Sequence, residues 1–134
     1  MGKNIQTRKQ NKLAAQQSSP LAATAKLRLA RVSAQKARLV ADLIRGNNCF
    51  DALVSLQFTR KKSARLFEKL LKSAIANAGV GLEDAADLRI HRIFVDQGPS
   101  IRRFRPRARG MAYRINKKTS HLTIELVREE SIEQ

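Results

Sequence analysis

The feature that most constrains this 134-residue chain is an acid-free, arginine-rich stretch between two strand-like runs. No Asp or Glu occurs between Asp96 and Glu125, and the interval carries eight cations: Arg102, Arg103, Arg105, Arg107, Arg109, Arg114, Lys117 and Lys118. Like charges this close repel one another, so we expect the stretch not to pack into a protein core. A polyanion would relieve the repulsion by supplying phosphates and releasing its counterions. Guanidinium groups also stack on bases, so the pattern indicates a nucleic-acid partner.

The charge of the whole chain supports that partner. The formal net charge is +16, of which residues 97–124 carry +8, whereas residues 125–134 carry −3. A uniformly basic surface would not concentrate its charge in one segment in this way. The length and the 43% hydrophobic content allow one modest core, so we expect a single domain.

Other classes of protein find no support in the sequence. No run approaches the roughly 18–20 apolar residues that span a bilayer, and no apolar segment follows the basic residues near the start, so we expect neither a membrane partner nor a secretory signal. The single Cys49 cannot form an internal disulfide and fits a reducing compartment. His91 and His121 lack metal-site spacing, so we expect no metal and no cofactor. The chain has no phosphate loop, no H-E-x-x-H and no apolar carboxylate pair, so we expect no enzyme.

Hydrophobic periodicity predicts a strand, three helices and two further strands. Ser33 is the expected N-cap of the first helix, Gly46 its left-handed end, and Thr59 the cap of the third helix. A phase change between Ile90 and Ile93 predicts a bulge. The predicted elements are strand 26–32, helices 33–45, 49–56 and 60–78, and strands 88–95 and 119–127.

The domain is expected to cover residues 24–128, between a flexible basic extension (1–23) and an acidic tail (129–134). Its predicted core is Leu27, Leu29, Val40, Ile44, Phe67, Leu71, Ile75 and Ile124. The last two strands bracket the arginine cluster, so we predict one long antiparallel hairpin, an arm of about residues 93–124, whose outer half has too few apolar residues to lie on a core.

Two patterns leave two readings open. Phe104 and Tyr113 interleave with the arginines and either stack on bases or pack across the hairpin. On the third helix, Lys61, Arg65, Lys69 and Lys72 form a basic stripe, which is either a solvated face or a phosphate contact.

Five ordered motifs give the chain a family resemblance: SAQKARLVADLIRG (33–46), SAIANA (73–78), IFVDQGPS (93–100), PRARG (106–110) and KTSHLTI (118–124). Together they closely resemble the bacterial-type large-subunit ribosomal protein twenty-two family, over about residues 24–128. The resemblance implies an α+β fold, with a three-stranded antiparallel sheet packed with three helices and a long protruding basic β-hairpin. It further implies a structural constituent of the large subunit that contacts several domains of the ribosomal RNA (rRNA), aids early assembly and lines the polypeptide exit tunnel.

The implied partners are large-subunit rRNA, neighbouring large-subunit ribosomal proteins and the nascent polypeptide, and the implied location is a cytoplasmic or organellar ribosome. We predict rRNA contacts for the eight arm cations and for Lys36, Arg38, Lys61, Lys62 and Arg65. The predicted tunnel-lining tip is Ile101, Arg102, Arg103, Phe104, Arg105, Pro106, Arg107, Ala108, Arg109 and Gly110. The rival interpretation is a free nucleic-acid-binding regulator or nucleoid-type protein, although no recognition helix or repeated module is visible.

Overall fold

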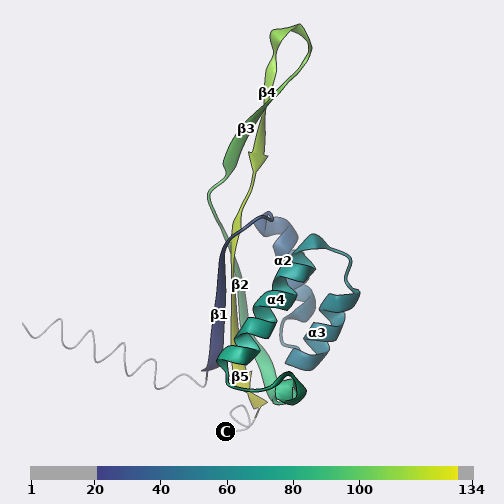
Figure 1. Ribbon diagram of the computed structural model, residues 1–134, viewed down its shortest axis with the longest axis vertical. Helices are drawn as coiled ribbons and strands as arrows, with labels where there is room; N and C mark the ends of the chain where they lie inside the picture. The colour runs from purple at the N-terminus through teal and green to yellow at the C-terminus, as the bar shows by residue number, and fades with distance from the viewer. Residues whose placement is uncertain (1–20, 130–134) are drawn as a thin grey trace, which may run out of the picture.

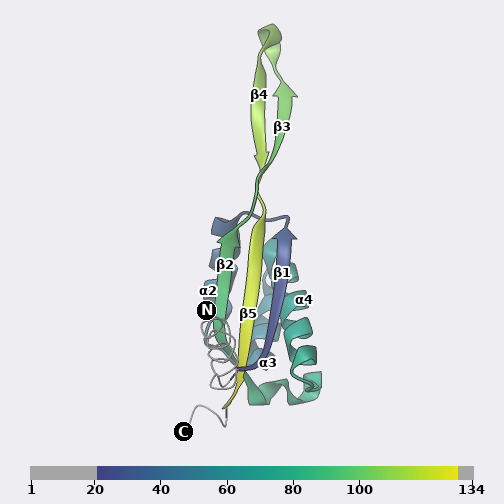
Figure 2. The same ribbon diagram turned by 90° about the vertical axis from the view of Figure 1, so that its left-hand side faces the viewer.

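The computed structural model describes residues 21–129 and has the predicted α+β fold (Figure 1). A three-stranded antiparallel sheet in the order β1-β5-β2 carries the helices on one face, and a separate two-stranded sheet, β3-β4, protrudes from one end (Figure 2). The elements are β1 (Leu21–Ala30), α2 (Ala34–Ile44), α3 (Cys49–Phe58), α4 (Lys62–Asn77), the 3-10 turn η1 (Leu82–Asp87), β2 (Leu88–Gln97), β3 (Ile101–Pro106), the 3-10 turn η2 (Ala108–Gly110), β4 (Ala112–Lys117) and β5 (Ser120–Arg128).

The core lies between the sheet and helices α2 and α4, with α3 packed against α4. Helix α2 buries a stripe at helical spacing, and α4 buries a longer one that includes Phe67, Leu71 and Ile75. The central strand β5 supplies alternate residues Leu122, Ile124 and Leu126, each fully buried. Six of the eight predicted core residues are buried: Val40, Ile44, Phe67, Leu71, Ile75 and Ile124.

The predicted start of the sheet was wrong. Strand β1 begins at Leu21, within the predicted extension, and pairs with β5 through Thr24↔Glu125 and Lys26↔Thr123. Its register slips between Leu27 and Ala30, where Leu29 adopts φ 56° and donates its N–H to His121 Nδ1 at 3.1 Å. Leu29 is therefore exposed and Leu27 half-buried, while Ala25 and Ala30 take the inward positions. The other residues of the predicted extension, and residues 130–134 of the predicted tail, lie outside the described residues.

Two of the three predicted helix signals are confirmed. Ser33 Oγ accepts a hydrogen bond from the Lys36 N–H at 3.4 Å, and Gly46 follows α2 with φ 76°. Thr59 is not the cap of α4: it closes α3, where its hydroxyl donates to the Ser55 carbonyl at 2.7 Å. Lys61 occupies the N-cap of α4 and makes no side-chain capping bond.

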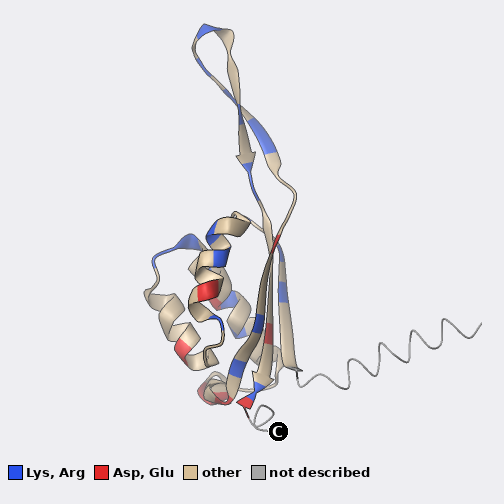
Figure 3. Cartoon of the chain, turned by 180° about the vertical axis from the view of Figure 1, so that it is seen from behind, with Lys and Arg blue, Asp and Glu red and all other residues tan. Residues whose placement is uncertain are grey.

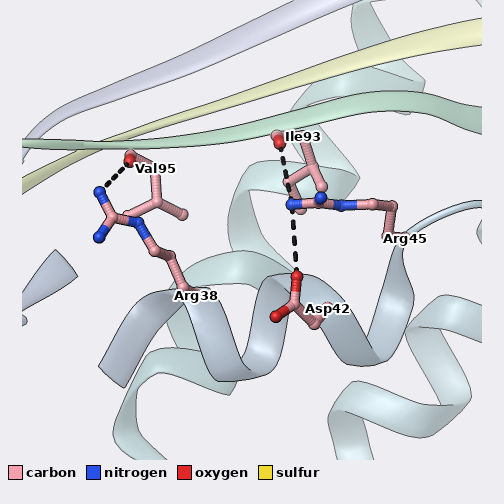
Figure 4. A network of polar contacts seen from close by, with 5 residues as sticks. All are labelled: Arg38, Asp42, Arg45, Ile93 and Val95. Atoms are coloured by element: carbon pink, nitrogen blue, oxygen red, sulfur yellow. Dashed lines mark hydrogen bonds and ion pairs between the residues drawn. The ribbon is translucent and has the colours of Figure 1, made fainter. Parts of the chain in front are cut away.

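Strand β2 forms one edge of the sheet, and α2 covers that edge with arginines (Figure 4). Arg38 donates to the Val95 carbonyl at 3.2 Å and Arg45 to the Ile93 carbonyl at 3.4 Å; Arg45 also lies 3.4 Å from the Asp42 carboxylate. These contacts occupy β2 carbonyls that an edge strand would otherwise offer to another chain. The predicted bulge in β2 is confirmed as a register shift between Ile90 and Arg92.

The long hairpin follows the predicted path, but its ladder is interrupted at a joint of residues 98–100 and 118–119. Pairing runs to Gln97↔Ser120 below the joint and resumes at Ile101↔Lys117 above it, so three residues face two. The Gly98 N–H donates to the Thr119 carbonyl at 2.9 Å, and Pro99 has no N–H with which to continue the ladder. The arm therefore forms a sheet of its own, joined to the domain by the two chain segments of the joint (Figure 1).

Candidate nucleic-acid interface

The arm exposes every cation of the arginine cluster. Among residues 21–129 no helix packs on strands β3 and β4, and of the residues in these strands only Ile101 and Ile115 are half-buried. The eight predicted arm cations are all exposed, and neither ion pair within residues 21–129 involves them. Figure 3 shows basic segments along both strands and at the tip of the arm. The arm is thus a cationic surface without internal compensation.

The register of the arm sorts its side chains onto two faces, because directly paired residues lie on the same side of a ladder. One face carries Arg102, Phe104, Arg114 and Asn116, and the other carries Ile101, Arg103, Arg105, Tyr113, Ile115 and Lys117. Phe104 and Tyr113 therefore lie on opposite faces and do not pack on each other across the ladder. With 70% and 54% of their surfaces exposed, respectively, each is free to contact a base.

The tip is a tight five-residue connection from Arg107 to Met111. The Arg107 N–H donates to the Met111 carbonyl at 2.7 Å, which closes the loop. Arg109 and Gly110 have φ 60° and 68°, so two consecutive residues take the left-handed conformation that turns the chain back. Arg107 and Arg109 are both exposed at this end.

A second basic surface lies at the base of the arm, in a groove between the starts of α2 and α4 and the end of β4. Its cationic lining is Arg31, Lys36, Lys61, Lys62, Lys117 and Lys118, and its lining contains no Asp or Glu. Neither helix has an acidic residue in its first turn. Lysines at a helix N-terminus meet the positive end of the helix dipole, so this arrangement favours an anion in the groove.

Five of the predicted site residues meet in this groove, and two of those predicted on the helices, Arg38 and Arg65, lie outside it. Lys36, Lys61, Lys62, Lys117 and Lys118 line it together. Arg38 lies on the other side of α2, where it contacts β2. Arg65 is exposed one turn along α4, but the predicted stripe beyond it is interrupted, because Lys72 Nζ lies 2.7 Å from Glu68 Oε1. The hydrogen bond from Lys72 lowers the pKa of the Glu68 carboxyl, so this pair is largely neutralised locally.

The remaining candidate groups are structural. Cys49 is buried, and its burial raises the pKa of the thiol to about 12, which keeps it protonated near neutral pH. His121 accepts a backbone hydrogen bond in the sheet. Within residues 21–129 no group of three or more His, Cys, Asp or Glu side chains is placed to hold a metal ion, and no helix is long and apolar enough to cross a membrane.

Sequence reasoning missed the groove as a unit, along with Arg31 and Asn116 in its lining. These residues are up to 87 positions apart and meet only when both helices start at the end of the sheet that bears the arm. One signal was present in the sequence: the first turn of each helix contains lysine and no carboxylate.

A comparison with protein families accords with this geometry. The family described as "Ribosomal protein L22p/L17e" matches residues 25–127, which is most of the chain and includes most of the sheet, all the helices and the whole arm.

Proposed function

The chain belongs to the ribosomal protein L22p/L17e family, and from this premise we propose that it joins segments of large-subunit rRNA, with its arm inserted between them. As a member it is a structural protein of the large ribosomal subunit that binds rRNA and neighbouring ribosomal proteins. The arm lines the polypeptide exit tunnel with its tip, Ile101 to Gly110, and there borders the nascent chain. These placements extend the family assignment to individual residues.

The uncompensated charge of the arm is the observation that carries this proposal. The arm carries eight exposed cations and no carboxylate, so in the isolated protein the repulsion between these cations destabilises the arm. Surrounding phosphates remove that cost, and guanidinium groups on both faces allow RNA on both sides at once. A surface used on one side only would not need Arg102 and Arg114 on one face and Arg103 and Arg105 on the other.

The groove supplies the second contact. Its six cations lie where the arm leaves the domain, so an RNA strand that follows the arm meets it next. We expect backbone phosphates there rather than base edges, because lysines bind phosphate as point charges and carry little sequence information. Held at both places, RNA would be drawn together early in assembly.

Hydroxyl-radical probing from single cysteines tests the proposal directly. Ala108→Cys places a tethered iron chelate at the arm tip, and Ala86→Cys places one in η1, at the opposite end of strand β2 from the arm. The native Cys49 is buried and its thiol protonated, so it should not be labelled. The probe at residue 108 should cut rRNA lining the tunnel in assembled large subunits.

The probe at residue 86 is the matched control and should cut different, peripheral rRNA. Cutting at the subunit surface from residue 108, or identical cutting patterns from both positions, would contradict the placement of the arm. Failure of the wild-type chain to enter large subunits would contradict the assembly role.

A further inference from the structure

An aromatic ring stands exposed at the end of α3, three residues before Lys61 of the groove. Phe58 is 82% exposed, the highest value among the large apolar side chains in residues 21–129. An isolated exposed apolar residue needs no explanation, but this one is the last residue of a helix and lies next to a basic segment.

The segment around Phe58 repeats, on a smaller scale, the charge pattern of the arm. No acidic residue occurs between Asp51 and Glu68, and the interval contains Arg60, Lys61, Lys62 and Arg65. All four side chains are exposed, and two of them line the groove. Figure 3 shows the connection between α3 and α4 in blue, at the end of the helical layer from which the arm protrudes.

This combination favours RNA over protein as the occupant. Protein interfaces are depleted in lysine around their apolar centres, whereas a ring flanked by cations matches a base flanked by phosphates. In double-stranded RNA the base faces are stacked within the helix, so a protein ring reaches only an unpaired base. The backbone that carries the ring is fixed, because the N–H and the hydroxyl of Thr59 both donate to the Ser55 carbonyl and close the helix there.

We propose that Phe58 stacks on an unpaired base of large-subunit rRNA, while Arg60, Lys61 and Lys62 hold the phosphates on either side of it. This inference rests on the proposed function, since it assumes that rRNA reaches the groove. It adds a contact to a base, which any of the four bases can make, at a place where the groove alone would bind only the backbone.

Tryptophan fluorescence tests the stacking, because the chain contains no Trp and Phe58→Trp creates a single reporter. Phe50→Trp is the matched control: it lies on the same helix, is 52% exposed, and sits about 12 Å away at 1.5 Å per residue, beside Asp51. Each full-length variant is titrated with large-subunit rRNA from the organism that encodes the chain. Emission from residue 58 should be quenched as the complex forms, and emission from residue 50 should not.

Phe58→Ala should weaken rRNA binding roughly 5- to 100-fold, because stacking contributes on that scale for each base. Its salt dependence should not change, since no charge is removed, whereas the double variant Lys61→Gln/Lys62→Gln should flatten it. The thermal midpoint of Phe58→Ala should match that of the wild type, given the exposure of the ring.

The outcomes separate this inference from the proposed function. If rRNA binds normally without quenching at residue 58, the stacking is wrong and the proposed function stands. If emission at residue 58 responds only when large-subunit proteins are added, the surface is a protein contact and the inference is overturned. If the wild-type chain does not bind rRNA at all, both fail.

Discussion

At the scale of single residues, Gly98 allows the two chain segments of the joint to approach each other closely where the arm leaves the domain. A Cβ at this position would lie 2.6 Å from Thr119 Oγ1 and 3.3 Å from the His121 ring, which is too close for an unstrained contact. Thr119 has little room to yield, because it is 2% exposed and its hydroxyl donates to the Pro99 carbonyl. The close approach of the two chain segments at the joint therefore requires glycine.

Gly98→Ala should lower the free energy of unfolding by about 1–3 kcal/mol, the usual cost of an overpacked contact, as measured by urea denaturation. Gly81→Ala is the matched control, because its nearest neighbour would be 4.0 Å away and Gly81 has φ −69°. The control should change stability by less than about 0.5 kcal/mol. If Gly98→Ala lowered the free energy of unfolding no more than the control does, the joint would tolerate a side chain.

At the scale of elements, the arm and the globular domain separate binding from stability. The domain buries the apolar residues of α2, α4 and β5, whereas β3 and β4 bury no side chain completely. Changes in the arm should therefore alter RNA affinity without unfolding the protein.

Replacing Arg102, Arg103, Arg105 and Arg107 by Gln should flatten the dependence of log K on log salt by up to about 3, at roughly 0.7 for each phosphate of single-stranded RNA that the arm no longer neutralises. The free energy of unfolding should stay the same or rise slightly, because repulsion within the arm decreases. Lys72→Gln should leave the slope unchanged, since Glu68 already pairs with Lys72. An unchanged slope in the quadruple variant would remove these arginines from the RNA interface.

At the scale of the whole molecule, charge is arranged along the long axis. Strand β2 runs from η1, which carries Glu83, Asp84 and Asp87, to the joint below the arm, a span of roughly 33 Å for ten residues at 3.3 Å each. The cationic arm and groove therefore lie away from this acidic end. In the field of a polyanion such a molecule orients before contact, with the arm leading.

The success of the predictions from sequence also depends on scale. Periodicity placed all three helices and both long strands to within about two residues at most ends, since each buried stripe is a local pattern. Leu29 was wrongly predicted to face inward. The face on which it lies depends on how β1 pairs with β5, and a register slip reverses the faces of a strand. The arm cations were visible as a run, whereas the groove needed the tertiary arrangement of α2, α4 and β4.

Shortening the arm tests its role in the assembled particle. Residues 101–117 are replaced by Asn-Gly between Ser100 and Lys118, which keeps the joint and its Gly98–Thr119 hydrogen bond. Because the removed segment buries so little, the purified variant should unfold within about 1 kcal/mol of the wild type. Ribosomes carrying it in the native host should translate tunnel-stalling sequences differently and respond differently to drugs that bind in the tunnel. Normal behaviour of such ribosomes would mean that the arm does not border the nascent chain, and loss of folding would mean that the arm belongs to the core.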